Sequence, residues 1–230
     1  MKKIILIAFS ALILTSCKDF KNLSKAGNLI AEYCGSTNIT ISTAYYTDTK
    51  NGSVDSYEIQ IKDAVDINNG NYPPEYLASV SAKTLYDNLN QEEKDDRDLI
   101  VVIIETPDKK FEYKYSIEKL SKVDFYLTTT REFILKIARG DSENLTNYLN
   151  NQTIDIQEFE KEIIKGKILR NDTLFKKINA IDLHCINFSL ENELKMTELI
   201  TFGEIGDGHI KFSTRFIDEK PEKISGITIY

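Results

Sequence analysis

The spacing of hydrophobic positions changes several times along the chain, and each change predicts a different element. Residues 38–46 (NITISTAYY) and 57–65 (YEIQIKDAV) alternate apolar and polar side chains, which is typical of β-strands with one buried face. An Asn51-Gly52 turn between the two runs predicts a β-hairpin. Residues 75–90 carry apolar side chains close to helical spacing, so we expect a helix after the hairpin.

A continuous apolar run marks the centre of the first folded region. Residues 99–105 (LIVVIIE) predict a strand covered on both faces. The alternating run at 109–117 is expected to pair with this strand through the turn at Pro107-Asp108. Residues 28–36 predict a short helix that ends at Gly35. The region 27–120 is therefore predicted as a ββαββ layer.

The second half places its helices first and its strands last. Helical spacing is expected over 131–151, interrupted at Gly140-Asp141, and over 154–168. Four strand-like runs follow almost without linkers, at 179–190, 193–204, 209–217 and 223–230. This order predicts helices packed on a four-stranded antiparallel curved sheet over 125–230. The fold class expected for the whole chain is α+β, with two small domains.

The amino-terminal residues follow a third pattern. Lys2 and Lys3 precede an apolar run from Ile4 to Leu14, which at eleven residues is shorter than the ~20 that a membrane-spanning helix needs. A positive start, a short apolar core and small residues after it are typical of a secretory signal peptide. The end of the run, Leu-Thr-Ser-Cys with the cysteine at Cys17, resembles the lipobox of bacterial lipoproteins. The alternatives are an ordinary signal peptide with a chance cysteine, or a buried amino-terminal helix.

The lipobox resemblance implies a lipid modification and a cellular location for the protein. It implies diacylglycerol on the Cys17 thiol, cleavage before Cys17 and acylation of the new amino terminus. Residues 1–16 would then be a signal peptide and residues 17–26 a lipidated tether. Each buried lipid CH₂ contributes about 0.8 kcal/mol, so two or more chains give a stable anchor. The expected location is the bacterial cell envelope, in the outer membrane, on either its periplasmic or its surface face.

Charge narrows the set of partners. Removing residues 1–16 changes the formal net charge from −7 to −9, because Lys2 and Lys3 leave and no acidic residue does. A strongly acidic body argues against binding to nucleic acid. The partners expected are the membrane, through the lipid, and a protein or a small ligand.

Two cysteines remain after Cys17. Cys34 and Cys185 could form a disulfide in an oxidising envelope, or could pack as two buried thiols. The second alternative is slightly favoured. The chain has no CxxC motif and only two histidines, so neither a metal site nor a cofactor is predicted.

The second half also carries a family resemblance. Helix, Gly-Asp, helix, and a final strand reading EKISGITIY (222–230) are similar to the cone-shaped fold of nuclear transport factor-like and cystatin-like domains. Enzymes with this fold carry an acid–histidine pair inside the cone. No pair in this chain can be matched to them residue by residue.

Strand alternation nevertheless suggests one polar face to search for a binding site. Asp182 and His184 are expected to share a strand face with Ile186 and could act as an acid–base pair. The more favoured alternative is a half-solvated polar strand face. The residues expected on the binding face of the cone are Asp182, His184, Lys195, Thr197, Lys211 and Arg215.

One acidic segment remains, QEEKDDRD at 91–98. It lacks the glycine of a calcium-binding loop and is expected to be a solvated helix end. The leading hypothesis is then a non-enzymatic, lipid-anchored envelope protein that binds a ligand or a protein partner. The alternatives are an envelope hydrolase or isomerase that uses Asp182 and His184, and a lipoprotein immunity or inhibitor factor that acts through charge complementarity.

Overall fold

The computed structural model describes residues 21–48, 52–64, 73–139, 144–161, 164, 177–178, 180–191, 194–205 and 208–230. The chain divides into two compact units, residues 1–120 and residues 121–230. Both helices and sheets are present, which confirms the α+β class. Within the described residues, no helix is both long and apolar enough to cross a membrane. Cys17 and the rest of the predicted lipobox lie outside the described residues.

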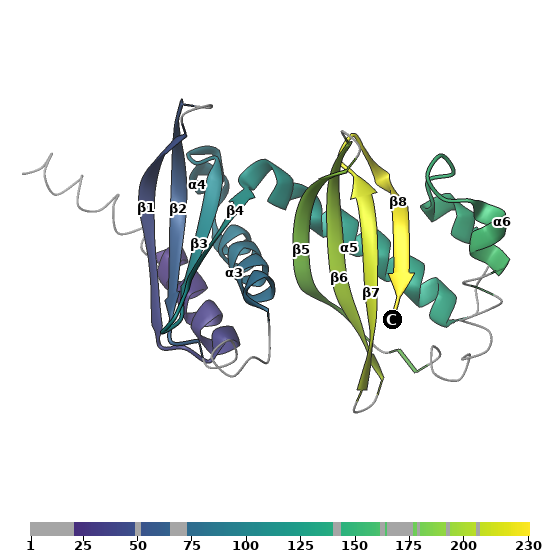
Figure 1. Ribbon diagram of the computed structural model, residues 1–230, viewed down its shortest axis with the longest axis horizontal. Coiled ribbons are helices and arrows are strands. Elements are labelled where there is room, and N and C mark those ends of the chain that lie inside the picture. The colour runs from purple at the N-terminus through teal and green to yellow at the C-terminus, as the bar shows by residue number, and fades with distance from the viewer. Residues whose placement is uncertain are drawn as a thin grey trace, which may run out of the picture. The chain divides into compact units, whose positions relative to one another are not determined.

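The first unit is built on a sheet in the order β1-β2-β3-β4 (Figure 1). Its strands are β1 (Asn38–Asp48), β2 (Gly52–Lys62), β3 (Leu99–Glu105) and β4 (Lys110–Ser116). β1 pairs with β2, and β3 with β4, in antiparallel fashion, whereas β2 and β3 are parallel. Residues Ile100 to Ile104 of β3 are all buried, which confirms the prediction of a central strand covered on both faces.

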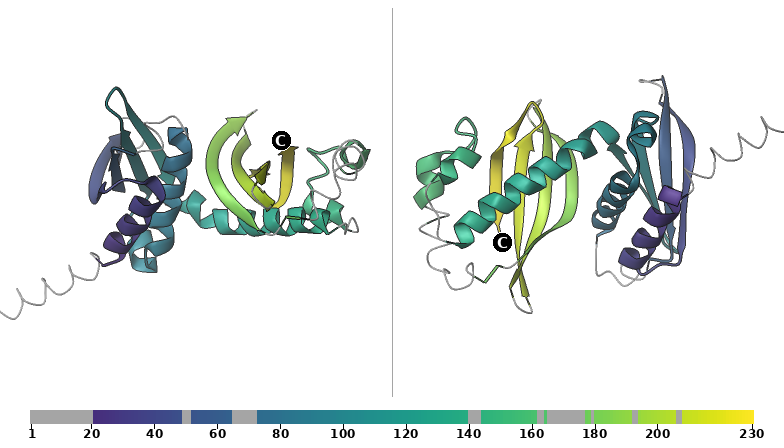
Figure 2. Two further views of the ribbon diagram at one scale, coloured as in Figure 1. Left: turned by 90° about the horizontal axis from the view of Figure 1, so that it is seen from below. Right: turned by 180° about the vertical axis from the view of Figure 1, so that it is seen from behind.

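Helices cover one face of this sheet. Residues 21–34 form an amino-terminal helix, and α3 (Pro74–Asn88) and α4 (Gln91–Asp95) lie in the crossover between β2 and β3. Figures 1 and 2 show the amino-terminal helix and α3 on the same side of the sheet. The Cys34 thiol lies 3.9 Å from the Ser81 hydroxyl, so these two helices are in contact.

The amino-terminal helix starts earlier than the sequence suggested. Its residues Ala26, Ile30 and Cys34, spaced four apart, are buried to 1% exposure or less. Because the residue at position 26 is a small alanine, the apolar stripe is weak in the hydropathy pattern, although its burial holds the helix on the sheet. Residues 21–26, expected to be a tether, are therefore part of the folded unit.

The second unit combines a long helix with a sheet in the order β5-β6-β7-β8. The strands are β5 (Ile181–Glu191), β6 (Leu194–Ile205), β7 (Gly208–Ile217) and β8 (Lys220–Ile229), each antiparallel to the next. The expected four-stranded antiparallel sheet is thus confirmed. Helix α5 (Ile117–Ala138), which begins at the end of the first unit, runs across one face of this sheet (Figure 2).

Helix α5 begins well before residue 131, where a helix was expected. Its buried positions Val123, Tyr126, Thr130, Phe133 and Ile137 recur every three or four residues. The β-branched run Thr128 to Thr130 disfavours a helix locally, but burial against the sheet outweighs that preference. The Tyr126 ring stacks on that of Phe216 with centroids 4.5 Å apart, and the hydroxyls of Thr130 and Thr214 lie 2.9 Å apart.

The other two predicted helices are described only in part. Residues 144–161 include a 3-10 turn, η1 (Leu145–Tyr148), and a short helix, α6 (Ile156–Phe159), which continues as π-helix at residues 160 and 161. Gly140-Asp141 and most of 162–176 lie outside the described residues.

The two cysteines do not form a disulfide. Cys34 is buried in the first unit and Cys185 in the second, and both are thiols. The Cys185 thiol lies 3.5 Å from the Asn187 side-chain oxygen within its own strand. Each cysteine therefore fills a place in the core of its own unit, as the slightly favoured alternative held.

The buried Tyr126 in the core of the second unit leads us to expect that the stability of the protein falls at alkaline pH. Burial, followed by the nearby Asp218 carboxylate, raises the pKa of Tyr126 to about 12, against about 10 in an unfolded chain. The folded state thus holds this proton more tightly, and the stability it gives is present below about pH 10 and lost as the pH rises toward about 12. The free energy of unfolding, measured by urea titration, should fall less steeply over this range in Tyr126→Phe than in the wild type.

The matched control is Tyr45→Phe, because Tyr45 is 82% exposed. It should keep the wild-type slope. Identical slopes for Tyr126→Phe and the wild type would contradict the account of this core.

Candidate functional site

The six residues expected on one face of the second sheet are divided between its two faces. Thr197 pairs across the strands with Phe216, and both face α5. Thr197 is 1% exposed, and its hydroxyl donates to the Asp218 carboxylate at 2.8 Å. Lys211 and Arg215 occupy the alternate positions of β7, opposite Phe202 and Glu198, and lie on the other face. Thr197 is therefore a core residue, and its assignment to a shared binding face is wrong.

A bulge in β5 separates the remaining candidates. Leu183 pairs with Thr201 and Cys185 with Ile200, so His184 is an extra residue without a partner position on β6. Asp182 pairs with Phe202 and Ile186 with Leu199, three residues apart on β6, which places Asp182 and Ile186 on opposite faces. The expectation that these two share a face is therefore wrong. The His184 side chain lies outside the described residues, and both Asp182 and Lys195 are exposed.

Arg215 reaches a shallow cavity at the edge of the second sheet. Its guanidinium lies over Gly226, where an added Cβ would come within 2.9 Å of the Arg215 Nε. The cavity measures about 350 Å³ and includes Asp155 and Glu158 on its wall. The wall of this cavity thus carries charges of both signs.

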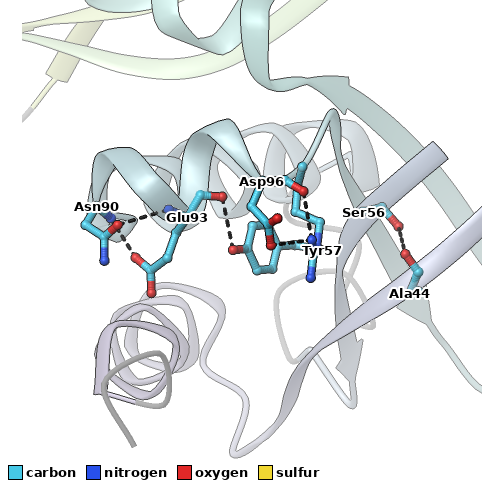
Figure 3. Close-up of polar contacts among 7 residues, drawn as sticks. Ala44, Ser56, Tyr57, Asn90, Glu93 and Asp96 are labelled. Carbon is cyan, nitrogen blue, oxygen red and sulfur yellow. Dashed lines mark hydrogen bonds and ion pairs between the residues drawn. The ribbon is translucent and has the colours of Figure 1, made fainter. Parts of the chain in front are cut away.

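A more informative site lies in the first unit, at the acidic segment. Glu92, Asp95, Asp96 and Asp98 are exposed, as expected for a solvated helix end, but Glu93 on α4 is only 7% exposed. The Asn90 side chain accepts from the Glu93 N–H at 3.0 Å, and the Glu93 Oε2 accepts from the Asn90 N–H at 2.6 Å. This reciprocal capping box fixes the start of α4 (Figure 3).

Two further contacts hold α4 against its surroundings. The Tyr57 hydroxyl of β2 donates to the Glu93 carbonyl oxygen at 3.1 Å, and the Asn22 side chain donates to the Glu93 Oε2 at 2.9 Å. Figure 3 shows the Glu93 carboxyl pointing away from α4, toward the amino-terminal helix. Its second oxygen, Oε1, is buried without a hydrogen-bond partner among the described residues. A buried carboxylate oxygen left without a partner is costly, so this charge is incompletely compensated.

Next to this carboxylate is a cavity of about 590 Å³, here called the acidic cavity. It lies between the amino-terminal helix, α4 and the sheet. Four of its residues are acidic and one is basic, and the Arg97 guanidinium is already bonded to the Asp96 carboxylate at 2.5 Å. The excess of negative charge favours a cationic group. Its walls are formed by Leu23, Thr43, Tyr57, Asn90, Glu92, Glu93, Asp95, Asp96 and Arg97.

A second cavity continues along the same seam. It measures about 400 Å³ and lies between the amino-terminal helix and β1. Leu23 belongs to both cavities. We call the pair of cavities, which both border β1, the β1 groove. The walls of the second cavity carry no charged side chain: Leu23, Ser24, Gly27, Asn28, Ala31, Thr37, Ile39, Thr40 and Ile41.

The strand beside this groove is an outer strand of its sheet. β1 pairs with β2 on one side, and on its other side it pairs with no strand of the described part of the chain. From Asn38 to Thr47 it has no charged residue, no proline and no glycine. The opposite outer strand, β4, alternates charged residues (Lys110, Glu112, Lys114) along its length. Charges and prolines normally protect outer strands from pairing with other chains, and β1 lacks this protection.

Sequence reasoning missed this site for a physical reason. Charged residues in a row are normally solvated, so the burial of Glu93 cannot be predicted from composition. One signal was present: Asn90 and Glu93 have the Asn-x-x-Glu spacing of a capping box. No protein-family model matches the chain, and neither the curated proteins nor the solved structures contain a match.

Proposed function

We propose that this protein is a lipid-anchored component of the bacterial cell envelope that binds a polypeptide partner by strand addition to β1. The anchor rests on the lipobox resemblance at Cys17. The binding function rests on one observation: an outer strand without protective charges borders two cavities along its helix-covered side.

Strand addition suits this arrangement for two reasons. An outer strand presents backbone N–H and C=O groups that an extended peptide can pair with, which gives affinity. Cavities beside the strand accept alternate side chains of the added strand, which gives specificity. β1 provides the backbone groups, and the amino-terminal helix forms the far wall of the cavities.

The other functions considered from the sequence stay predictions. An acid–base role for Asp182 and His184 would need a shared cavity, and the bulge at His184 interrupts the alternation on which their pairing was argued. An immunity or inhibitor role would be one form of the proposed binding, with the acidic cavity as its charged element.

The anchor is tested at Cys17. Cys17→Ser should abolish metabolic labelling with palmitate and move the protein from the membrane fraction to the soluble fraction, because serine offers no thiol for the lipid. Ser16→Ala is the matched control: it keeps a small residue in the lipobox and should be labelled normally. Continued labelling of Cys17→Ser would refute the anchor.

The binding site is tested by filling the groove at Gly27. The full chain in detergent would be screened against a phage library of random dodecapeptides, and the selected peptides synthesised and titrated. An added Cβ at Gly27 would lie 3.7 Å from the Ile41 Cδ1, an ordinary contact, and leucine is more favourable in a helix than glycine by up to about 1 kcal/mol. Gly27→Leu should therefore fold and abolish binding of the selected peptides.

Gly27→Ala is the control, because it adds only the Cβ and leaves most of the cavity open. It should bind the peptides as the wild type does. Selection of no peptide, or unchanged binding by a folded Gly27→Leu, would count against strand addition at β1.

A further inference from the structure

We infer that the polypeptide added at β1 carries a lysine or arginine side chain in the acidic cavity and an apolar side chain two residues away. This inference rests on the proposed function and adds the chemistry of the partner to it. Three features of the first unit lead to it: the register of β1, the charge of one cavity and the apolar character of the other.

The register of β1 determines which side chains of an added strand enter the groove. Ile39, Ile41 and Thr43 of β1 pair with Ile61, Ile59 and Tyr57 of β2, which are buried under the helices. Side chains of an added strand alternate between the two faces, and those on the same face lie about 7 Å apart. A residue opposite Thr43 would thus reach the acidic cavity, and the residue two positions along, opposite Ile41, would reach the other cavity.

The acidic cavity lacks a balancing cation. Glu92, Asp95 and Asp96 are exposed, whereas Glu93 is only 7% exposed. The Glu93 Oε1 has no hydrogen-bond partner among the described residues. A charge held away from water is screened weakly, so its potential extends into the neighbouring cavity. The single arginine on the wall, Arg97, is committed to Asp96.

A side-chain cation fits these features better than a metal ion. In the part of the chain that the structure describes, no three histidine, cysteine or acidic side chains converge closely enough to hold a metal. The cavity volume of about 590 Å³ accommodates a long side chain. Lysine and arginine combine a terminal cation with an apolar stem, and that stem can pack on Leu23 and Tyr57.

The second cavity favours an apolar residue. Ile39 and Ile41 border it from β1, and Leu23 and Ala31 from the helix. Gly27 leaves room between them, since outside its own helix turn the Ile41 Cδ1 is the one described atom within 4 Å of the place of its missing Cβ. The expected recognition pattern is therefore a basic residue, any residue, and an apolar residue, read along the added strand in one direction.

Paired peptides test this inference. Each peptide selected on the full chain would be synthesised with its lysine or arginine and again with norleucine at that position, and both titrated at low and at high salt. The norleucine peptide should bind about tenfold more weakly or worse, as expected for the loss of a charge-assisted contact. The advantage of the basic peptide should shrink at high salt.

Protein variants locate the effect. Glu92→Gln with Glu93→Gln should weaken the basic peptide and leave the norleucine peptide unchanged, because glutamine keeps the acceptor of the capping box. Asp98→Asn is the matched control: it removes a charge from the same segment, but Asp98 is not on the wall of the acidic cavity. It should bind both peptides as the wild type does.

The outcomes distinguish this inference from the proposed function. Equal affinities for the basic and norleucine peptides, with both still lost in Gly27→Leu, would overturn the inference and leave strand addition standing. Selection of no peptide at all would overturn both.

Discussion

The parallel pairing of β2 with β3 is the constraint on which the candidate site depends. Parallel neighbours cannot be joined by a tight turn, so the chain must cross over between Lys62 and Leu99. The crossover places α3 and α4 on one face of the sheet. The hairpin partner β1 is left as the outer strand beside β2. An acidic segment and an outer strand that are distant in the sequence thereby become the walls of one groove.

Within this frame, α4 is positioned by a small number of polar contacts. The capping box of Asn90 and Glu93 orients its first turn, and the Tyr57 hydroxyl holds the Glu93 carbonyl. Asn22 ties the same glutamate to the amino-terminal helix. These contacts hold the carboxylate in a buried position, yet one of its oxygens has no hydrogen-bond partner among the residues that the structure describes. This feature connects the architecture of the first unit to the proposed preference for a cationic side chain.

Much of this architecture could be predicted from the sequence, because apolar periodicity decides which face of an element is buried. The run LIVVIIE gave the central strand β3, and the alternating runs after residue 179 gave the second sheet. The starts of the amino-terminal helix and of α5 were not predictable in this way. Ala26 adds little to the hydropathy of the buried stripe of the amino-terminal helix. Thr128 to Thr130 favour a strand when taken alone, and the burial of Tyr126 and Phe133, which makes this segment helical, is visible only in the structure.

The candidate site was less predictable than the fold. Strict alternation placed Asp182 and Ile186 on one face of the sheet, but the bulge at His184 puts them on opposite faces. A bulge cannot be recognised from the alternation of apolar and polar residues alone. Thr197 looked like a surface residue and is covered by α5. The burial of Glu93 within the acidic segment was not predictable, because it depends on Tyr57 and Asn22, which come from other elements.

The proposed anchor at Cys17 and the β1 groove are close along the chain. Three residues, 18–20, separate Cys17 from the first described residue of the helix that forms the wall of the groove. On the proposed anchoring, the partner strand would be bound near the membrane surface. The two functions proposed for the protein, attachment and strand recognition, would thus be combined within its first unit.

Hydrogen exchange of the backbone amides is the most direct test of the central claim, that a partner adds to β1. The full chain would be measured alone and with a saturating selected peptide, and the two outer strands of the first sheet compared. The account predicts new protection at alternate amides of β1 (Asn38–Asp48) and none at β4 (Lys110–Ser116). Unchanged exchange along β1 in the presence of a bound peptide would contradict it.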